Sequence, residues 1–147
     1  MPKHVSVQEA HDLQQQGHVY LDVRSTGEFE QGHPAGAVNV PLLEPVERTG
    51  QMAQNPDFVR VMQASFPPST QLLVGCMVGS RSMRAAQILE AFGFADVSNV
   101  QGGFGGARDP MGQTVDPGWA DAGLPVESGN PEGRGFGDLL TKADGGS

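Results

Sequence analysis

The sequence predicts an α/β fold: a three-layer α/β/α arrangement with a central, mostly parallel sheet of five short strands. Apolar runs of strand length alternate along the chain with segments whose apolar residues recur at helical spacing. Strands joined through helices form parallel sheets that are covered on both faces. A chain of 147 residues is long enough for one such core.

The first half of the chain predicts two capped helices and two strands. Ser6 and Glu9 form a capping-box pattern, so we expect a helix over residues 7–16, ended by Gly17. An apolar strand at 19–21 follows. The same cap pattern at 25–28 predicts a short helix that stops before Gly32, and a strand at 37–40 ends at Pro41.

The second half predicts two more helices and two more strands. Asn55 precedes a proline and an acidic residue, a pattern typical of a helix start, so we expect a helix over 56–65. Its buried side should carry Phe58, Val59, Met62 and Phe66. A strand at 72–75, a helix at 82–92 ended by Gly93, and a strand at 97–100 follow, so that four of the five expected strands are placed by residue.

The only cysteine of the chain, Cys76, directly follows the strand at 72–75. Open α/β sheets place their ligand sites at the carboxyl ends of the strands. There the backbone N–H groups of residues 77–82 can surround one point, and the next helix adds its positive dipole end. Such a loop holds an anion and favours the thiolate over the thiol.

A lone cysteine after an apolar run is more often a small buried residue than a nucleophile. Here the neighbouring residues favour function. Gly79 allows a tight turn, Arg81 adds a cation, and Ser80 or Ser82 can cap the helix. The expected anion-binding loop therefore runs from Met77 and Val78 through Ser82, with Cys76 as nucleophile.

Three ordered motifs resemble the rhodanese-type sulfurtransferases, especially the single-domain kind of bacteria and plants. The first is the loop of residues 76–82, CMVGSRS. The second comprises LDVR at 21–24, Glu28-Phe29 and GHPAGAVNVP at 32–41, and the third is VQGG at 100–103. The resemblance runs from about residue 5 to 126, most of the chain.

This resemblance implies a thiosulfate sulfurtransferase with Cys76 and Arg81 as catalytic residues. Its expected substrates are a sulfur donor such as thiosulfate and a thiophilic acceptor such as cyanide, a thiol or an acceptor protein. Residues 77–80 and Ser82 would bind the substrate, and no metal or organic cofactor is required. The residues alone support only a nucleophilic cysteine in an anion-binding loop.

The first motif predicts supporting residues rather than catalysts. We expect Arg24 and Glu28 to form an ion pair that holds the loop against the sheet. Asp22 lies at a strand end near the cysteine loop, where it can accept hydrogen bonds from that loop's N–H groups or from the edge of the next strand. His33 matches a family position that is usually structural, and a catalytic base is the alternative.

Composition narrows the class of partner and the location. The net charge is −8, with 17 acidic against 9 basic residues, so a nucleic-acid partner is not expected. No apolar run is long enough for a membrane span, and the amino terminus lacks the apolar stretch of a signal peptide. Together with the single cysteine, these features predict a cytoplasmic protein.

The chain departs from the family pattern after Gly103. Residues 105–118, rich in Gly and Pro, are expected to form an inserted loop without regular structure near the site, within a domain covering 1–128. Residues 129–147 are expected to be a Gly-rich, mostly disordered tail.

Two other functions remain open. Phosphatases and arsenate reductases also use a loop from cysteine to arginine, but those phosphatases resemble C-x5-R, whereas Cys76 and Arg81 enclose four residues. The other alternative is a non-catalytic binding module with the same fold. Its usual mark is a lost cysteine, and Cys76 is present.

Overall fold

The computed structural model describes residues 2–46, 48–77 and 80–145, without the side chains of Ser80 and Arg108. Its centre is an all-parallel sheet of five strands in the order β1-β8-β7-β2-β4. These strands are β1 (Lys3–Val5), β2 (Val19–Asp22), β4 (Val38–Asn39), β7 (Gln71–Gly75) and β8 (Asp96–Val100). The predicted fold class is confirmed. The expectations for Val78, Gly79 and the side chain of Ser80 lie outside the described part.

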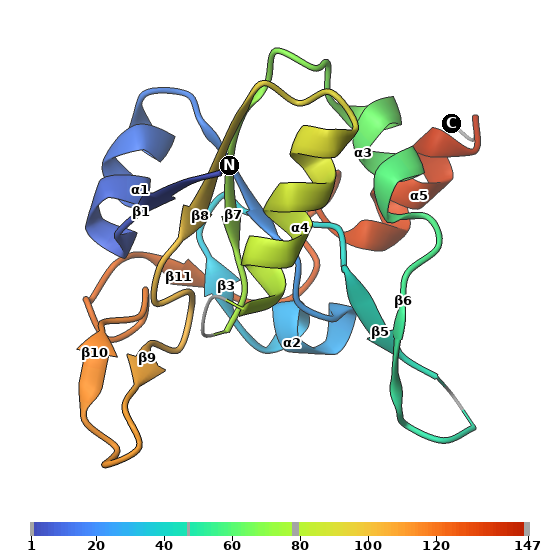
Figure 1. Cartoon of the computed structure of the whole chain (residues 1–147). Coiled ribbons are helices and arrows are strands. Elements are labelled where there is room, and N and C mark those ends of the chain that lie inside the picture. The colour runs from blue at the N-terminus through green and yellow to red at the C-terminus, as the bar shows by residue number, and fades with distance from the viewer. Residues whose placement is uncertain (1, 47, 78–79, 146–147) are drawn as a thin grey trace.

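Helices cover both faces of this sheet (Figure 1). Apolar residues of α3 (Phe58–Ser65), α4 (Ser80–Ala91) and α5 (Phe136–Ala143) share one core cluster with Leu21, Leu72 and Val74. The alternate residues Tyr20 and Leu73 belong to a second cluster with α1 (Val7–Gln15), Phe29 of α2 (Thr26–Gln31) and Trp119. The strands are therefore buried on both faces, as parallel strands require.

Both predicted capping boxes are formed. Ser6 accepts a hydrogen bond from Glu9 N at the start of α1, and Ser25 does the same for Glu28 N at the start of α2. The third helix begins at Phe58, two residues later than predicted. Asn55 makes a turn there instead, because its side chain accepts from Asp57 N and donates to Pro41 O.

In the described part of the chain, three small antiparallel pairs extend from this core. They are β5 (Leu43–Pro45) with β6 (Met52–Gln54), β3 (His33–Pro34) with β11 (Val126–Glu127), and β9 (Ala107–Arg108) with β10 (Thr114–Asp116). The last pair corrects the expectation that 105–118 lack regular structure. The Asp109 carboxylate accepts from Met111 N and Gln113 N, and Gly112 supplies a positive φ, so the loop closes as a hairpin.

The expectation of a mostly disordered tail is also corrected, for residues 129–145. Helix α5 packs Leu139, which is buried, together with Phe136 and Leu140 against the cluster that contains α3. Before the helix, Arg134 O accepts a hydrogen bond from Asn39 N at the sheet edge. An apolar stripe at helical spacing, together with this hydrogen bond, holds a Gly-rich segment on the core.

Among the residues the structure describes, no helix is long and apolar enough to cross a membrane.

Candidate active site

Cys76 lies directly after β7, a central strand flanked by β8 and β2, at the carboxyl edge of the sheet. Its side chain is buried, with 1% exposed. The sulfur accepts a hydrogen bond from the backbone N–H of Ser82, at 3.3 Å, in the first turn of α4. The predicted position of the cysteine at a helix N-terminus is therefore confirmed, and this N–H and the helix dipole act on the sulfur.

A chain of polar side chains leads from Cys76 to the sheet edge. The Cys76 thiol donates to Ser82 Oγ at 3.4 Å, and the Ser82 hydroxyl donates to Asn99 Oδ1 at 2.5 Å. Asn99 Nδ2 lies 3.4 Å from Nδ1 of His4. Asn99 was missed by sequence reasoning, although a buried amide within an apolar strand is the kind of signal that identifies such a residue.

The segment after β8 supports the cysteine loop from behind. Phe104 N donates to Cys76 O at 2.7 Å, and Gly105 N donates to Met77 O at 2.8 Å. Gly103 has φ +54°, and a Cβ there would lie 2.3 Å from Cys76 O. The glycines of the third motif therefore allow two backbones to approach closely enough to bond.

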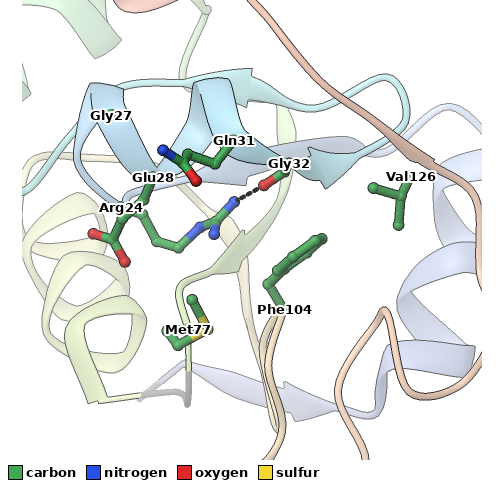
Figure 2. A pocket seen from close by; sticks show the side chains of 8 residues that line it. All are labelled: Arg24, Gly27, Glu28, Gln31, Gly32, Met77, Phe104 and Val126. Atoms are coloured by element: carbon green, nitrogen blue, oxygen red, sulfur yellow. Dashed lines mark hydrogen bonds between the residues drawn. The ribbon is translucent and has the colours of Figure 1, made fainter.

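A pocket of about 500 Å³ opens beside Met77, between the cysteine loop and α2 (Figure 2). Its walls include Arg24, Gln31, Gly32, Met77, Phe104 and Val126. Of the predicted substrate-binding residues, Met77 lines this pocket and Ser82 contacts the cysteine sulfur.

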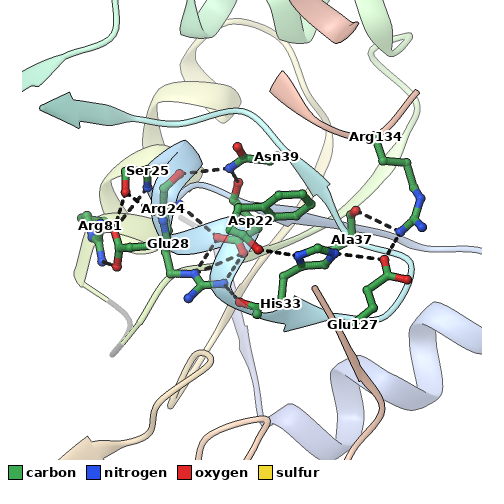
Figure 3. A network of polar contacts seen from close by, with 12 residues as sticks. Asp22, Arg24, Ser25, Glu28, His33, Ala37, Asn39, Arg81, Glu127 and Arg134 are labelled. Atoms are coloured by element: carbon green, nitrogen blue, oxygen red, sulfur yellow. Dashed lines mark hydrogen bonds and ion pairs between the residues drawn. The ribbon is translucent and has the colours of Figure 1, made fainter. Parts of the chain in front are cut away.

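Arg81 and Glu28 form a two-pronged ion pair, with Nη1 to Oε1 at 2.7 Å and Nη2 to Oε2 at 3.0 Å (Figure 3). The predicted pair between Arg24 and Glu28 is therefore wrong. Glu28 is already oriented by the capping box, in which Ser25 N and Ser25 Oγ both donate to Oε1. The start of α2 thus holds the start of α4, beside the cysteine loop.

This ion pair shifts the pKa values of both side chains. Hydrogen bonding from Arg81, with a smaller contribution from Ser25, lowers the pKa of Glu28 from 4.5 to about 2. The same contact raises the pKa of Arg81. Both groups are charged at neutral pH, and each largely neutralises the other.

Arg24 instead pairs with Asp22, and both side chains are buried. Nε donates to Asp22 Oδ1 at 3.0 Å, and Nη2 donates to Asp22 Oδ2 at 2.7 Å and to Gly32 O at 2.6 Å. The guanidinium also lies 4.6 Å from the centre of the Phe104 ring. Within the described residues, the Asp22 carboxylate serves Arg24 rather than the cysteine loop or the next strand.

His33 has a structural position. The ring is fully buried and stacks on Phe29 at 3.6 Å. Its Nδ1 lies 2.6 Å from Phe29 O, and Nε2 lies 3.0 Å from Glu127, which also bonds Arg134 (Figure 3). His33 therefore connects the end of α2 to the carboxyl-terminal segment. Hydrogen bonding from Arg134 lowers the pKa of Glu127 to about 2.

Within the described residues, no cluster of three or more His, Cys, Asp or Glu side chains could hold a metal ion.

An all-parallel α/β sheet with a thiol between the carboxyl end of a central strand and the next helix defines a class of α/β proteins whose cysteine lies where this architecture places its ligand sites. Residues 6–108 match the model of the Rhodanese-like domain. The chain belongs to this family.

Relatives agree with the assignment. The chain is 39% identical over 128 residues to Thiosulfate sulfurtransferase 16, chloroplastic, of Arabidopsis thaliana, covering 87% of this chain and 95% of that protein. It is 38% identical over 105 residues to Senescence-associated protein DIN1 of Raphanus sativus, covering 71% of this chain and 56% of that protein. These similarities support a sulfurtransferase.

The crystal structure of Rv0390 from M. tuberculosis has a similar fold. Its TM-score is 0.68 at 24% identity, over 86% of this chain and 100% of that one.

Proposed function

We propose that the protein transfers sulfane sulfur from thiosulfate to a thiophilic acceptor through a persulfide on Cys76. The observation that carries this proposal is the hydrogen bond from Ser82 N–H to the Cys76 sulfur at the start of α4. An N–H and a helix N-terminus stabilise the thiolate that must attack. The relative named Thiosulfate sulfurtransferase 16 supports thiosulfate as the donor.

The reaction has two balanced steps. The Cys76 thiolate attacks the outer sulfur of thiosulfate; a new S–S bond forms, the S–S bond of thiosulfate breaks, and sulfite leaves with its electron pair. Cyanide or a thiolate then attacks the terminal sulfur of the persulfide, and Cys76 leaves as a thiolate. The sulfur atom is transferred without an external oxidant or reductant in either step.

Arg81 serves in this proposal by holding the loop. Its guanidinium is occupied by Glu28 through two hydrogen bonds, so its main effect is to fix the start of α4 relative to α2. Glu28, Ser25, Asp22 and Arg24 then act as supporting residues. The hydrogen bond from Phe104 N–H to Cys76 O fixes the same loop from the other side.

Mass spectrometry of the intact protein after thiosulfate treatment tests the proposal. We expect one added sulfur, mapped to Cys76, that cyanide removes as thiocyanate. Cys76→Ser should keep the fold and gain no sulfur, because a hydroxyl is not ionised there and forms no persulfide. Thiosulfate turnover by Cys76→Ser would contradict the mechanism.

The same protein should be assayed with aryl phosphate and arsenate, since phosphatases related by fold use a cysteine-to-arginine loop. The loop of four residues between Cys76 and Arg81 favours sulfur transfer. Phosphatase or arsenate-reductase turnover faster than sulfur transfer would reverse the choice. For location we propose the cytoplasm, since a lone cysteine suits a reducing compartment, and cell fractionation checks it.

A further inference from the structure

We propose that the pocket beside Met77 binds the sulfur acceptor, and that this acceptor is an organic thiol with an apolar body and one oxygen acceptor group. The inference rests on the proposed sulfur transfer through Cys76. It adds an acceptor class and the residues that select it.

The pocket adjoins the reacting residue. Met77, which follows Cys76 in the chain, forms part of its wall. Phe104 forms another part, and its backbone N–H is bonded to Cys76 O. The terminal sulfur of a persulfide extends about 2 Å beyond the cysteine sulfur. A thiol bound between Met77 and Phe104 therefore lies beside the loop that carries this sulfur.

The volume indicates an organic molecule. The pocket measures about 500 Å³, whereas one water occupies about 30 Å³ of liquid. Cyanide would leave most of this space to solvent. The volume lies within the range of sites that bind small organic ligands, about 300 to 1,000 Å³.

The walls are suited to an apolar body. Met77, Phe104 and Val126 present a thioether, an aromatic ring and a branched aliphatic side chain. Val126 is 48% exposed, although it is a large apolar residue at the pocket. It belongs to β11, outside the residues 6–108 that match the family model. An aromatic or aliphatic group in the pocket would cover these three side chains and exclude water from them.

The charges around the pocket do not favour an inorganic dianion. Arg24 is neutralised by Asp22, and Glu28 is neutralised by Arg81. The two pairs leave no net charge to attract thiosulfate to this wall. Binding here depends instead on apolar contact and on single hydrogen bonds.

Arg24 supplies such a hydrogen bond. Its side chain is only 2% exposed, and its Nε and Nη2 are bonded to Asp22 and Gly32. Within the described part of the chain, Nη1 donates to no protein group, and Arg24 lines the pocket (Figure 2). An N–H group without a protein partner at a pocket wall favours an oxygen acceptor, which a carboxylate or carbonyl of the thiol would provide.

The transfer step is balanced. The thiolate of the acceptor attacks the terminal sulfur of the Cys76 persulfide, forming one S–S bond. The bond between that sulfur and Cys76 breaks, and its electron pair returns to Cys76 as a thiolate. The acceptor leaves as an organic persulfide, and no external oxidant or reductant takes part.

The test loads the full chain with thiosulfate and measures how fast each acceptor discharges the persulfide. The probes are cyanide, 2-mercaptoethanol, benzyl mercaptan and 4-(mercaptomethyl)benzoate, the three thiols having similar intrinsic reactivity. We expect kcat/KM for benzyl mercaptan to exceed that for 2-mercaptoethanol by about tenfold or more, the size of a small apolar selectivity. The benzoate should gain further through Arg24.

Variants identify the pocket. Val126→Ser and Phe104→Ala should each lower the ratio of benzyl mercaptan to 2-mercaptoethanol by about tenfold, mainly through a higher KM. Val115→Ser, on the hairpin and 62% exposed, is the matched control and should leave that ratio at its native value.

The outcomes separate the two proposals. No persulfide on Cys76, or none discharged by cyanide, would refute the sulfur transfer itself. A persulfide that cyanide discharges, with equal kcat/KM for all three thiols or with ratios unchanged in both pocket variants, would refute the acceptor site alone. A benzoate no better than benzyl mercaptan would refute the contact with Arg24.

Discussion

Replacing Arg81 by lysine tests whether this residue acts through geometry or through charge. Arg81 holds Glu28 with two parallel hydrogen bonds of 2.7 and 3.0 Å. Lysine keeps the charge but lacks the planar group that makes both bonds. The loss of one charged hydrogen bond is about 1.5 to 3 kcal/mol. If this loss raises the free energy of the transition state, kcat/KM for thiosulfate falls roughly 10- to 100-fold.

The assay is thiocyanate formation from thiosulfate and cyanide, measured at several salt concentrations. Arg84→Lys is the matched control, since Arg84 is exposed on the same helix and should tolerate the change. Glu28→Gln should cause a loss similar to Arg81→Lys, because it removes the partner of the same contact. In the double variant the two losses should not add, since they break one interaction.

Two results would refute this reasoning. Nearly native kcat/KM in Arg81→Lys, together with strong weakening of the native enzyme by salt, would mean that Arg81 attracts the donor by its charge. Additive losses in the double variant would mean that Arg81 and Glu28 act separately.

Three further predictions concern stability. Gly103→Ala should lower the free energy of unfolding, measured by denaturant titration, by roughly 2 to 5 kcal/mol. The reason is that an added Cβ is unfavourable at a left-handed φ and would also contact Cys76 O. A change below about 1 kcal/mol would show that the loop adjusts easily to the Cβ. The pKa of Glu28 is lowered in the folded state, so its stabilising contribution is complete above pH 4.5 and declines as the pH falls toward about 2. After allowance for solvent screening it is about 1 kcal/mol, and acid unfolding of Glu28→Gln should lack it; identical acid profiles would contradict the shift. Leu139→Ala should cost about 2 to 4 kcal/mol if α5 is part of the core, whereas unaltered thermal unfolding would mean that the helix contributes nothing.

Local patterns determined much of this fold. Both capping boxes were readable because Ser6 and Ser25 reach N–H groups only three residues away. The strand before Cys76 and the helix after it were readable from apolar periodicity. Because this strand and this helix are adjacent in the sequence, the thiol was expected at a helix N-terminus, and no distant contact was needed for that prediction. The cysteine was therefore predictable as the centre of the site.

Errors arose where a distant partner competed with a near one. Glu28 was expected to pair with Arg24, four residues away, yet Arg81 reaches it from another helix. The guanidinium of Arg24 instead donates hydrogen bonds to Asp22 and to Gly32 O. Sequence spacing lists only the near candidates, whereas packing of α2 beside α4 decides which charges meet.

The hairpin at 107–116 and helix α5 show the same limit for backbone structure. Their Gly-rich composition indicated flexibility, because local propensity alone cannot offset the entropy of ordering such segments. Asp109 closes the hairpin, and the buried Leu139 anchors the helix on the cluster that contains α3. The sequence by itself determined the strand before Cys76, the two capping boxes and the position of the cysteine before a helix, since each depends on neighbouring residues. Only the tertiary structure decided the ion pair between Arg81 and Glu28, the pocket wall at Val126 and the order of the tail, since each depends on contact with residues far away in the chain.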